Sequence, residues 1–278
     1  MSVPGPALFF IVLILLTPLR LHAETLTQRI VTVDSNATEI LIALGLGQKI
    51  VAADVTSQSL LSSDVPNLGY HRALSAEGIL DNNPDWVVGS DHMGPEETLS
   101  LLKKAPLRLV QLNSPKNLTE LKANITALGQ LLGREQEATS LVTRVDQLGK
   151  QLSAVGDKQQ NIIFLLDLGD RGLSQAGSGT TADALITLLG GHNLGQFSGY
   201  KSVSVEALLS ISPDVILLGQ RSDSEADIER ILQRQPLLIN TPAGRKDNII
   251  GVNAGKLIAG ISLGALDEAL AISEQLTP

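Results

Sequence analysis

The sequence predicts an α/β protein of two Rossmann-like lobes with mainly parallel sheets, joined by a long rigid helix and separated by a cleft. Three observations support this fold class. Short β-branched runs alternate with helical segments, two helices follow one another near the middle of the chain, and one motif occurs twice. Alternation of strands and helices is typical of parallel sheets covered by helices. The 43% hydrophobic and 3% aromatic content indicates an aliphatic core.

The first 23 residues have the pattern of a secretory signal peptide. Their apolar run, residues 7–16, is shorter than the roughly 20 residues of a bilayer span, and Leu21-His22-Ala23 fits a signal peptidase site. A buried N-terminal helix is the alternative, but three prolines interrupt it. The absence of cysteine excludes disulfides, thiolate sites and a lipid anchor on cysteine. We therefore expect a soluble protein exported to the periplasm.

The mature chain is acidic. Without residues 1–23, it has 20 Lys and Arg against 29 Asp and Glu, a net charge of −9. Nucleic acid and anionic membranes are poor partners for such a surface.

The N-terminal lobe is predicted to span residues 24–133. A β-branched strand at 30–33 leads through an Asp-Ser-Asn loop into a helix over 37–44, which ends at Gly45. Further short strands are predicted at 50–53, 86–88 and 107–110.

Two consecutive helices are predicted next, over 118–132 and 135–155, with Gly133 dividing them. The second, assigned to 134–156, is the expected rod between the lobes, because no strand interrupts the helical pattern. The C-terminal lobe, 157–278, has strands predicted at 162–166, 215–218 and 249–252.

One motif occurs twice at a constant offset. The segment LSAEGIL at 74–80 reappears as VSVEALL at 203–209. Each copy is preceded by a Gly-Tyr pair and followed by Pro-Asp and an apolar strand. Two copies are too few for a solenoid, so the lobes are interpreted as duplicated units.

These segments resemble the periplasmic haem-binding proteins that share an architecture with cobalamin- and siderophore-binding proteins. The resemblance covers essentially the whole mature chain and is most specific at 68–78, 175–184 and 199–208. It implies a non-enzymatic protein that binds haem, ferric protoporphyrin IX, in an interlobe cleft. It further implies delivery to the permease dimer of an ABC importer with a cytoplasmic ATPase, downstream of an outer-membrane haem receptor. One departure is the family's Gly-Pro-Arg segment, replaced here by Gly260–Ala265.

The resemblance implies that Tyr70 is the axial ligand of the haem iron, because it occupies the tyrosine of the family's Gly-Tyr-x-Arg motif. Tyrosine oxygen is an established haem ligand. Its pKa near 10 requires a nearby cation to favour the phenolate. In an extended loop Arg72 points the same way as Tyr70, whereas His71 points elsewhere. The alternative for Tyr70 is a half-buried loop tyrosine bonded to a backbone carbonyl.

Three further residues are predicted to contact haem. Tyr200 and Lys201, from the second copy of the motif, would line the opposite cleft wall, and Arg171 would meet a propionate. The alternatives are a packed tyrosine, a solvated lysine and a solvent-facing arginine. By the same resemblance Glu77 and Glu206 would dock onto the permease. Their alternative is support of a helix N-terminus, where negative charge is favourable.

No pattern of catalytic residues is evident. Gly177–Thr181 lacks the lysine of a Walker motif and the spacing of a dinucleotide fingerprint, so its amides are expected to line the cleft or cap a helix near Ala182. The Gly-x-Ser-x-Gly sequence at 260–264 does not directly follow a predicted strand, as the nucleophile elbow of a hydrolase does. An exported α/β enzyme therefore fits less well than a binding protein, while a ferric siderophore or corrinoid remains an alternative ligand.

Overall fold

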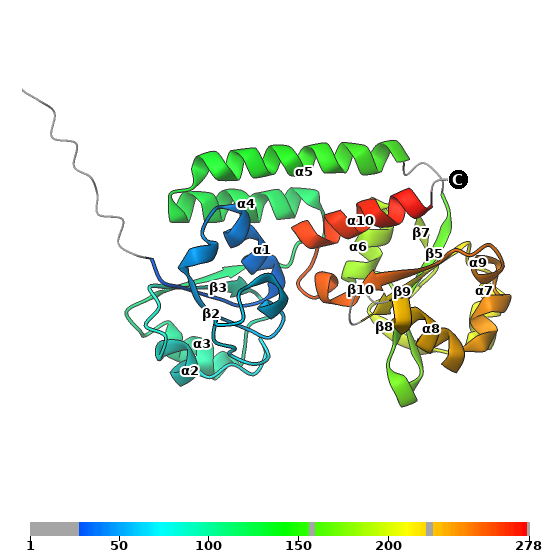
Figure 1. Cartoon of the computed structure of the whole chain (residues 1–278), viewed down its shortest axis with the longest axis horizontal. Coiled ribbons are helices and arrows are strands. Elements are labelled where there is room, and N and C mark those ends of the chain that lie inside the picture. Colours follow the sequence, from blue (N-terminus) through cyan, green and yellow to red (C-terminus); the bar gives the residue numbers. More distant parts are fainter. Residues whose placement is uncertain (1–27, 156–158, 221–224, 277–278) are drawn as a thin grey trace, which may run out of the picture.

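The computed structural model describes residues 28–155, 159–220 and 225–276, which form two α/β lobes side by side (Figure 1). The predicted signal peptide, residues 1–23, lies outside this range. No helix within it is long and apolar enough to cross a membrane.

The N-terminal lobe is built on a parallel sheet of four strands in the order β2-β1-β3-β4. Its strands are β1 (Ile30–Thr32), β2 (Ile50–Ala53), β3 (Trp86–Ser90) and β4 (Arg108–Leu112). Its helices are α1 (Ser35–Ala43), α2 (Ala76–Leu80) and α3 (Glu96–Leu102), with short 3₁₀ turns at Gly47–Lys49 and Gln58–Leu60.

The C-terminal lobe has a six-stranded mixed sheet in the order β10-β9-β5-β6-β8, with β7 beside β5. Its strands are β5 (Asn161–Asp167), β6 (Leu173–Ala176), β7 (His192–Asn193), β8 (Tyr200–Val203), β9 (Val215–Gln220) and β10 (Ile249–Asn253). Its helices are α6 (Thr181–Leu188), α7 (Val205–Ile211), α8 (Glu225–Arg234), α9 (Pro242–Arg245) and α10 (Leu263–Gln275). The 3₁₀ turns are Gly169–Arg171, Pro236–Asn240 and Ala254–Leu257.

The fold class is confirmed, with one difference in this second sheet. Strands β6 and β8 are antiparallel to their neighbours, whereas the sequence predicted only the parallel strands β5, β9 and β10. After β5 the chain turns back within Gly169–Arg171, without a crossover helix, and a direct return of this kind produces antiparallel pairing.

Two long helices connect the lobes, at the positions the sequence predicts. Helix α4 (Leu118–Leu132) ends at Gly133, which adopts a left-handed φ of 66°, and α5 (Glu135–Val155) follows. Figure 1 shows α4 above the N-terminal lobe and α5 running across both lobes. One buried apolar cluster continues from Ile125 on α4 through Val145 and Leu152 on α5 to Ala269 on α10. The lobes therefore share a core.

The duplicated motif forms equivalent helices in the two lobes. Ser75 and Ser204 are the N-caps of α2 and α7, each accepting a hydrogen bond on its hydroxyl from the backbone three residues on. After each helix an aspartate ties the next strand to the first strand of its lobe. Asp85 accepts from the backbone N–H of Arg29 at 2.8 Å, and Asp214 from that of Asn161 at 3.1 Å.

A buried carboxyl shapes the turn from β1 into α1. Asp34 has a φ of 73° and caps α1 by accepting a hydrogen bond from the N–H of Ala37. Its second oxygen accepts from the N–H of Ser90 at 2.6 Å, which fixes the end of β3. Burial is the largest influence and raises the pKa of Asp34 to about 6.

A larger side chain at position 129 should disturb the close packing of α4 against α5. A Cβ atom here would lie closer than 3.0 Å to the Cβ of Ala138 and 3.1 Å from the carbonyl oxygen of Arg134. We expect Gly129→Ala to lower the free energy of unfolding by about 1–2 kcal/mol, because overpacking outweighs the gain in helix propensity. Urea unfolding followed by the fluorescence of Trp86, the chain's one tryptophan, measures this.

The matched control is Gly78→Ala, also in a helix. The nearest atom to its new Cβ is 3.8 Å away, so we expect unchanged stability or a gain of up to about 1 kcal/mol. Equal effects of the two substitutions would contradict the close-packing interpretation.

Asp34→Asn should remove the contribution of the Asp34 carboxyl group to the pH dependence of the free energy of unfolding. The folded-state pKa of about 6 lies above the ordinary value of 3.8, so the folded protein holds an extra proton between these pH values. As pH rises through this window, the free energy of unfolding of the wild type should therefore fall relative to that of the variant. The fall is on the order of 3 kcal/mol. Urea unfolding near pH 4, 5, 6 and 7 measures it, and a constant difference between the proteins would exclude this role.

Candidate ligand-binding site

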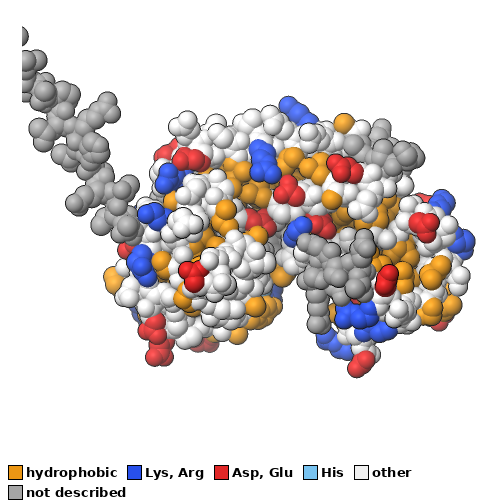
Figure 2. All heavy atoms as spheres, viewed as in Figure 1, with side chains coloured by type: hydrophobic (Ala, Val, Ile, Leu, Met, Phe, Trp, Pro, Cys, Tyr) orange, Lys and Arg blue, Asp and Glu red, His pale blue; other side chains and the backbone are white. Residues whose placement is uncertain are grey.

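The candidate site lies between the lobes. Figure 2 shows a hollow there that opens on the side away from α5. Its enclosed part is a pocket of about 370 Å³. From the N-terminal lobe it is lined by residues that follow the carboxyl ends of β3 and β4: Asp91, His92, Ser114, Pro115 and Lys116. From the C-terminal lobe it is lined by the start of α6 and one glycine: Gly179, Thr180, Thr181, Asp183, Ala184, Thr187 and Gly260. Ligands of open α/β sheets bind at such strand ends.

The Gly177–Thr181 segment lies beside the cleft and before a helix, as predicted, but the helix is capped by a side chain rather than by the amides of the segment. Gly179 lines the pocket. Thr180 is the N-cap of α6, and its hydroxyl accepts a hydrogen bond from the N–H of Asp183 at 3.1 Å. The segment therefore forms part of one cleft wall and leads into α6.

The lobes touch beside this pocket, through the stretch that stands in place of Gly-Pro-Arg. The N–H of Ile261 donates to the carbonyl oxygen of Pro115 at 2.7 Å. Gly260, with a φ of 83°, lies against Pro115 so closely that a Cβ atom has no room. The carboxylate of Glu39 accepts from the N–H of Gly264 at 2.7 Å. Burial is the largest influence on Glu39 and raises its pKa. This stretch joins the lobes and presents no arginine.

Tyr70 and Arg72 lie on a loop of the N-terminal lobe. Tyr70 is 51% exposed, Arg72 is exposed and His71 is buried. The predicted extended loop is wrong, because the N–H of Ala73 donates to the carbonyl oxygen of Tyr70 at 2.8 Å and closes a turn, and the ring of His71 lies beside that of Tyr70. Two backbone bonds hold the loop, from Val55 N–H to the oxygen of Gly69 at 2.8 Å and from Gly94 N–H to the oxygen of His71 at 3.0 Å.

The sequence analysis assigned no role to His92, yet it lines the interlobe pocket. Its Nε2 lies 3.4 Å from the hydroxyl of Ser114, within hydrogen-bond distance. Burial lowers the pKa of His92, opposed by the charge of Asp91, while Arg72 lowers it further. The signal that would have found His92 is its place directly after a buried strand, at the carboxyl edge of the sheet.

Tyr200 and Lys201 differ in local backbone structure from the matching residues of the first lobe. Tyr70 stands in a loop, whereas Tyr200 begins β8 at the edge of the sheet. Tyr200 is 46% exposed, and partial burial raises its pKa. The ammonium of Lys201 lies 5.0 Å from the centre of the Phe197 ring.

Arg171 is exposed in the turn between β5 and β6. Within the described part of the chain, it does not line the interlobe pocket or either of the other two cavities described here.

A smaller cavity, of about 240 Å³, lies at the carboxyl ends of β5 and β9. Its lining includes Asp167, Gln220, Arg230 and Arg234. Asp167 and Arg234 form an ion pair. Asp167 directly follows the strand predicted at 162–166. The arginines come from α8, whose contact with that strand end depends on tertiary packing.

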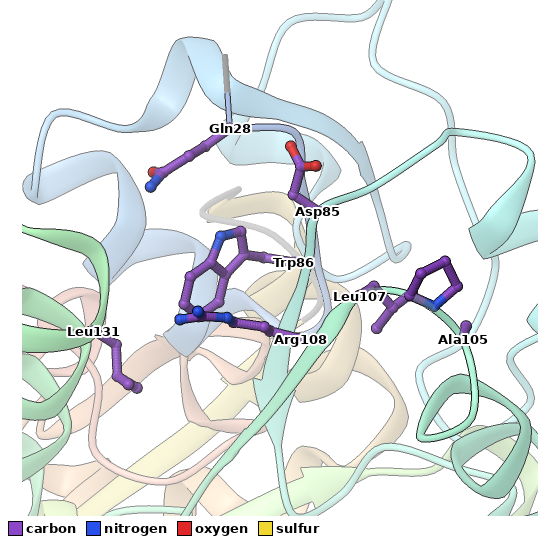
Figure 3. A pocket seen from close by; sticks show the side chains of 8 residues that line it. Gln28, Asp85, Trp86, Ala105, Leu107, Arg108 and Leu131 are labelled. Atoms are coloured by element: carbon purple, nitrogen blue, oxygen red, sulfur yellow. The ribbon is translucent and has the colours of Figure 1, made fainter. Parts of the chain in front are cut away.

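A further cavity lies at the opposite edge of the N-terminal sheet. This groove of about 560 Å³ is lined by residues at the amino ends of β3 and β4 and by Leu131 of α4. Figure 3 shows the side chain of Arg108 beside the indole of Trp86, with its guanidinium 4.9 Å from the ring centre. Because this groove lies at the amino ends of the strands, it is not part of the ligand-binding cleft.

The two predicted docking residues are both exposed in the first turns of matching helices, Glu77 on α2 and Glu206 on α7. Hydrogen bonds from its own backbone N–H and from Ser204 lower the pKa of Glu206. Both glutamates are therefore accessible to a partner, and both also occupy a position where the helix dipole favours a negative charge.

Comparison with known proteins places this geometry in context. The profile described as "Periplasmic binding protein" matches residues 30–254. The chain is 25% identical over 245 residues to the vitamin B12-binding protein of Vibrio cholerae serotype O1, covering 86% of each chain.

Solved structures with the same fold include three relevant proteins. The periplasmic haem-binding protein HutB of Vibrio cholerae is 36% identical with a TM-score of 0.82, over 91% of this chain and 100% of that one. A periplasmic haem-binding protein from Pseudomonas aeruginosa is 30% identical with a TM-score of 0.80, over 90% and 93%. The vitamin B12-binding protein BtuF of Vibrio cholerae is 24% identical with a TM-score of 0.71, over 89% and 95%, and shows the fold alone. The family match covers most of the chain and both lobes, and these relatives are binding proteins rather than enzymes. The chain therefore belongs to the periplasmic binding protein family of ABC importers.

Proposed function

We propose that the protein binds haem in the interlobe cleft and delivers it to an ABC importer, with Tyr70 as the axial ligand of the ferric iron. The observation that carries the proposal is Tyr70 itself, half exposed on a loop of the N-terminal lobe, with the exposed arginine Arg72 two residues along the chain. An accessible phenol and a cation close in the chain are what phenolate ligation needs.

The donor set favours iron held in a macrocycle over a free ion. Among the described residues no group of three or more His, Asp or Glu side chains is placed to hold a metal ion. Porphyrin nitrogens fill four positions, so the protein need supply only an axial ligand. The two solved relatives with at least 30% identity cited above are haem-binding proteins, which supports the same ligand.

A corrinoid is the second candidate, favoured by the vitamin B12-binding protein that matches at 25% identity. Titration with hemin and with cyanocobalamin in parallel distinguishes the two. Quenching of Trp86 fluorescence by the absorbing ligand reports either binding event.

We further propose the cellular context that the family implies. The mature protein would act in the periplasm after removal of residues 1–23, downstream of an outer-membrane haem receptor. Tyr200, Lys201 and Arg171 would contact the porphyrin or its propionates from the second lobe. Glu77 and Glu206 would dock onto the permease dimer, one from each lobe.

Tyr70→Phe should abolish the charge-transfer absorption of ferric tyrosinate, because it removes the ligand oxygen and keeps the ring. We expect the affinity for hemin to fall by at least about tenfold, the loss of one strong polar interaction. Tyr200→Phe is the matched control and should keep the absorption band. Visible-spectrum titration measures both. A Tyr70→Phe protein with the wild-type spectrum and affinity would refute the assignment of the ligand.

Arg72→Ala should weaken hemin binding less than Tyr70→Phe does, because it removes the cation and leaves the ligand. Because the phenolate becomes harder to form, we expect the tyrosinate absorption of the variant to appear only at a higher pH than that of the wild type. A spectrophotometric pH titration of the hemin complex measures this. A titration curve identical to that of the wild type would leave Arg72 without a role in ligation.

Charge reversal at Glu77 and Glu206 together should separate docking from ligand binding. Exposed ion pairs contribute about 0–1 kcal/mol each, and one on each lobe would set orientation as well as affinity. We expect Glu77→Lys with Glu206→Lys to bind hemin normally but to fail in stimulating the importer ATPase in reconstituted vesicles. Reversal of Glu96 and Glu135, two further exposed glutamates at helix starts, is the control. Normal stimulation at limiting binding protein would exclude the docking role.

A further inference from the structure

His71 stands directly behind Tyr70 and is buried, with 2% of its surface exposed. The two ring centres are 4.2 Å apart and the ring planes are inclined by 50°. Tyr70 itself is half exposed, so only part of its ring is covered by the protein. The phenol therefore rests on an imidazole that the protein interior holds in place.

A buried carboxylate lies beside the imidazole. Nδ1 of His71 lies 3.5 Å from Oδ2 of Asp54, which is fully buried. Asp54 is fixed in turn, because its oxygens accept hydrogen bonds from the hydroxyls of Thr56 and Ser57, each at 2.7 Å. The N–H of Asp34 adds a third bond at 2.9 Å. These contacts connect the turn after β1, the turn after β2 and the Tyr70 loop.

The backbone of His71 is fixed as well. Its carbonyl oxygen accepts from the N–H of Gly94 at 3.0 Å, and Leu74 N–H donates to the oxygen of Gly94 at 3.0 Å. A residue held by its main chain and by its ring changes conformation less readily than the exposed tyrosine beside it.

We infer that His71 is the positioning residue of the site, which fixes the orientation of the Tyr70 ring before haem arrives; the inference rests on the proposed role of Tyr70 as the iron ligand. Groups behind a metal ligand orient it, and a carboxylate paired with an imidazole is a common form of such support. A ligand side chain whose rotation is already restricted loses less entropy on binding. His71 acts through Tyr70 and does not touch the haem.

The test compares variants that remove or keep the ring. His71→Leu and His71→Asn remove it, and we expect hemin to dissociate about 2–10-fold faster, the range for one side chain that must be ordered on binding. We also expect the tyrosinate signals in the visible and electron paramagnetic resonance spectra to broaden into more than one species. His71→Phe keeps a ring behind Tyr70 and should restore a single species and a near wild-type rate.

A stability control separates positioning from simple damage to the lobe. Thr98 is buried and its hydroxyl donates to the carbonyl oxygen of Leu74 at 2.8 Å, at the end of the same loop. Thr98→Val should lower the melting temperature but leave the hemin spectrum and dissociation rate unchanged. Spectral broadening in Thr98→Val equal to that in His71→Leu would overturn the inference.

A double-mutant cycle with Tyr70→Phe decides the matter. If His71 acts through Tyr70, adding His71→Leu to Tyr70→Phe should change the dissociation rate by less than about twofold. Additive effects of the two substitutions would overturn the positioning role and leave Tyr70 as the ligand. Unchanged hemin binding in Tyr70→Phe alone would instead overturn the proposed function, and the two failures are thereby distinguishable.

Discussion

The structure depends on the apolar contact that α5 makes with both lobes. Helix α5 packs on α4 at one end and on α10 and α6 towards the other, and the buried side chains along it belong to one continuous cluster. Separation of the lobes would expose this core to water, at about 25 cal/mol for each Å² of apolar surface. The cleft is therefore formed by the fold itself, and its walls are in place without a ligand.

The polar groups of the cleft are organised around this fixed frame. On the N-terminal side, Asp34, Asp54 and Glu39 are largely or fully buried, and each accepts backbone hydrogen bonds. Asp34 and Asp54 fix the loops that follow the strands, and Glu39 reaches across to the start of α10. Burial of three carboxyl groups is unfavourable unless each is bonded. The network is therefore best understood as the means by which a short parallel sheet orients its ligand-facing loops.

Much of the fold could be predicted from local sequence signals. The pair α4 and α5 follows from helical spacing around Gly133, and the duplicated motif located α2, α7 and the strands after them. Strands β6 and β8 could not be found in this way, because the pattern of β6 does not specify its partner and β8 ends where the second copy of the motif begins. The motif indicated similarity between Tyr70 and Tyr200, but the local backbone differs.

The site likewise combines residues that local motifs predict with residues that only the tertiary structure brings together. Tyr70, Arg72 and the Gly177–Thr181 segment follow motifs that are contiguous in sequence. The contact of Gly260 with Pro115 joins residues far apart in the chain, and the arginines of α8 reach the end of β5 only through packing. His71 is the instructive residue, since the sequence predicted that it points away from Tyr70, and only the tertiary structure shows that its ring lies between Tyr70 and Asp54.

Strand β8 affects whether copies of the protein associate with one another. It forms one edge of the C-terminal sheet, and an unpaired edge offers backbone N–H and carbonyl groups to a strand of another molecule. Lys201 stands within this strand and is exposed. A charged side chain there disfavours edge-to-edge association, because stacking copies would bring like charges together. Whatever it contributes to a ligand, Lys201 thereby favours a monodisperse protein at high concentration.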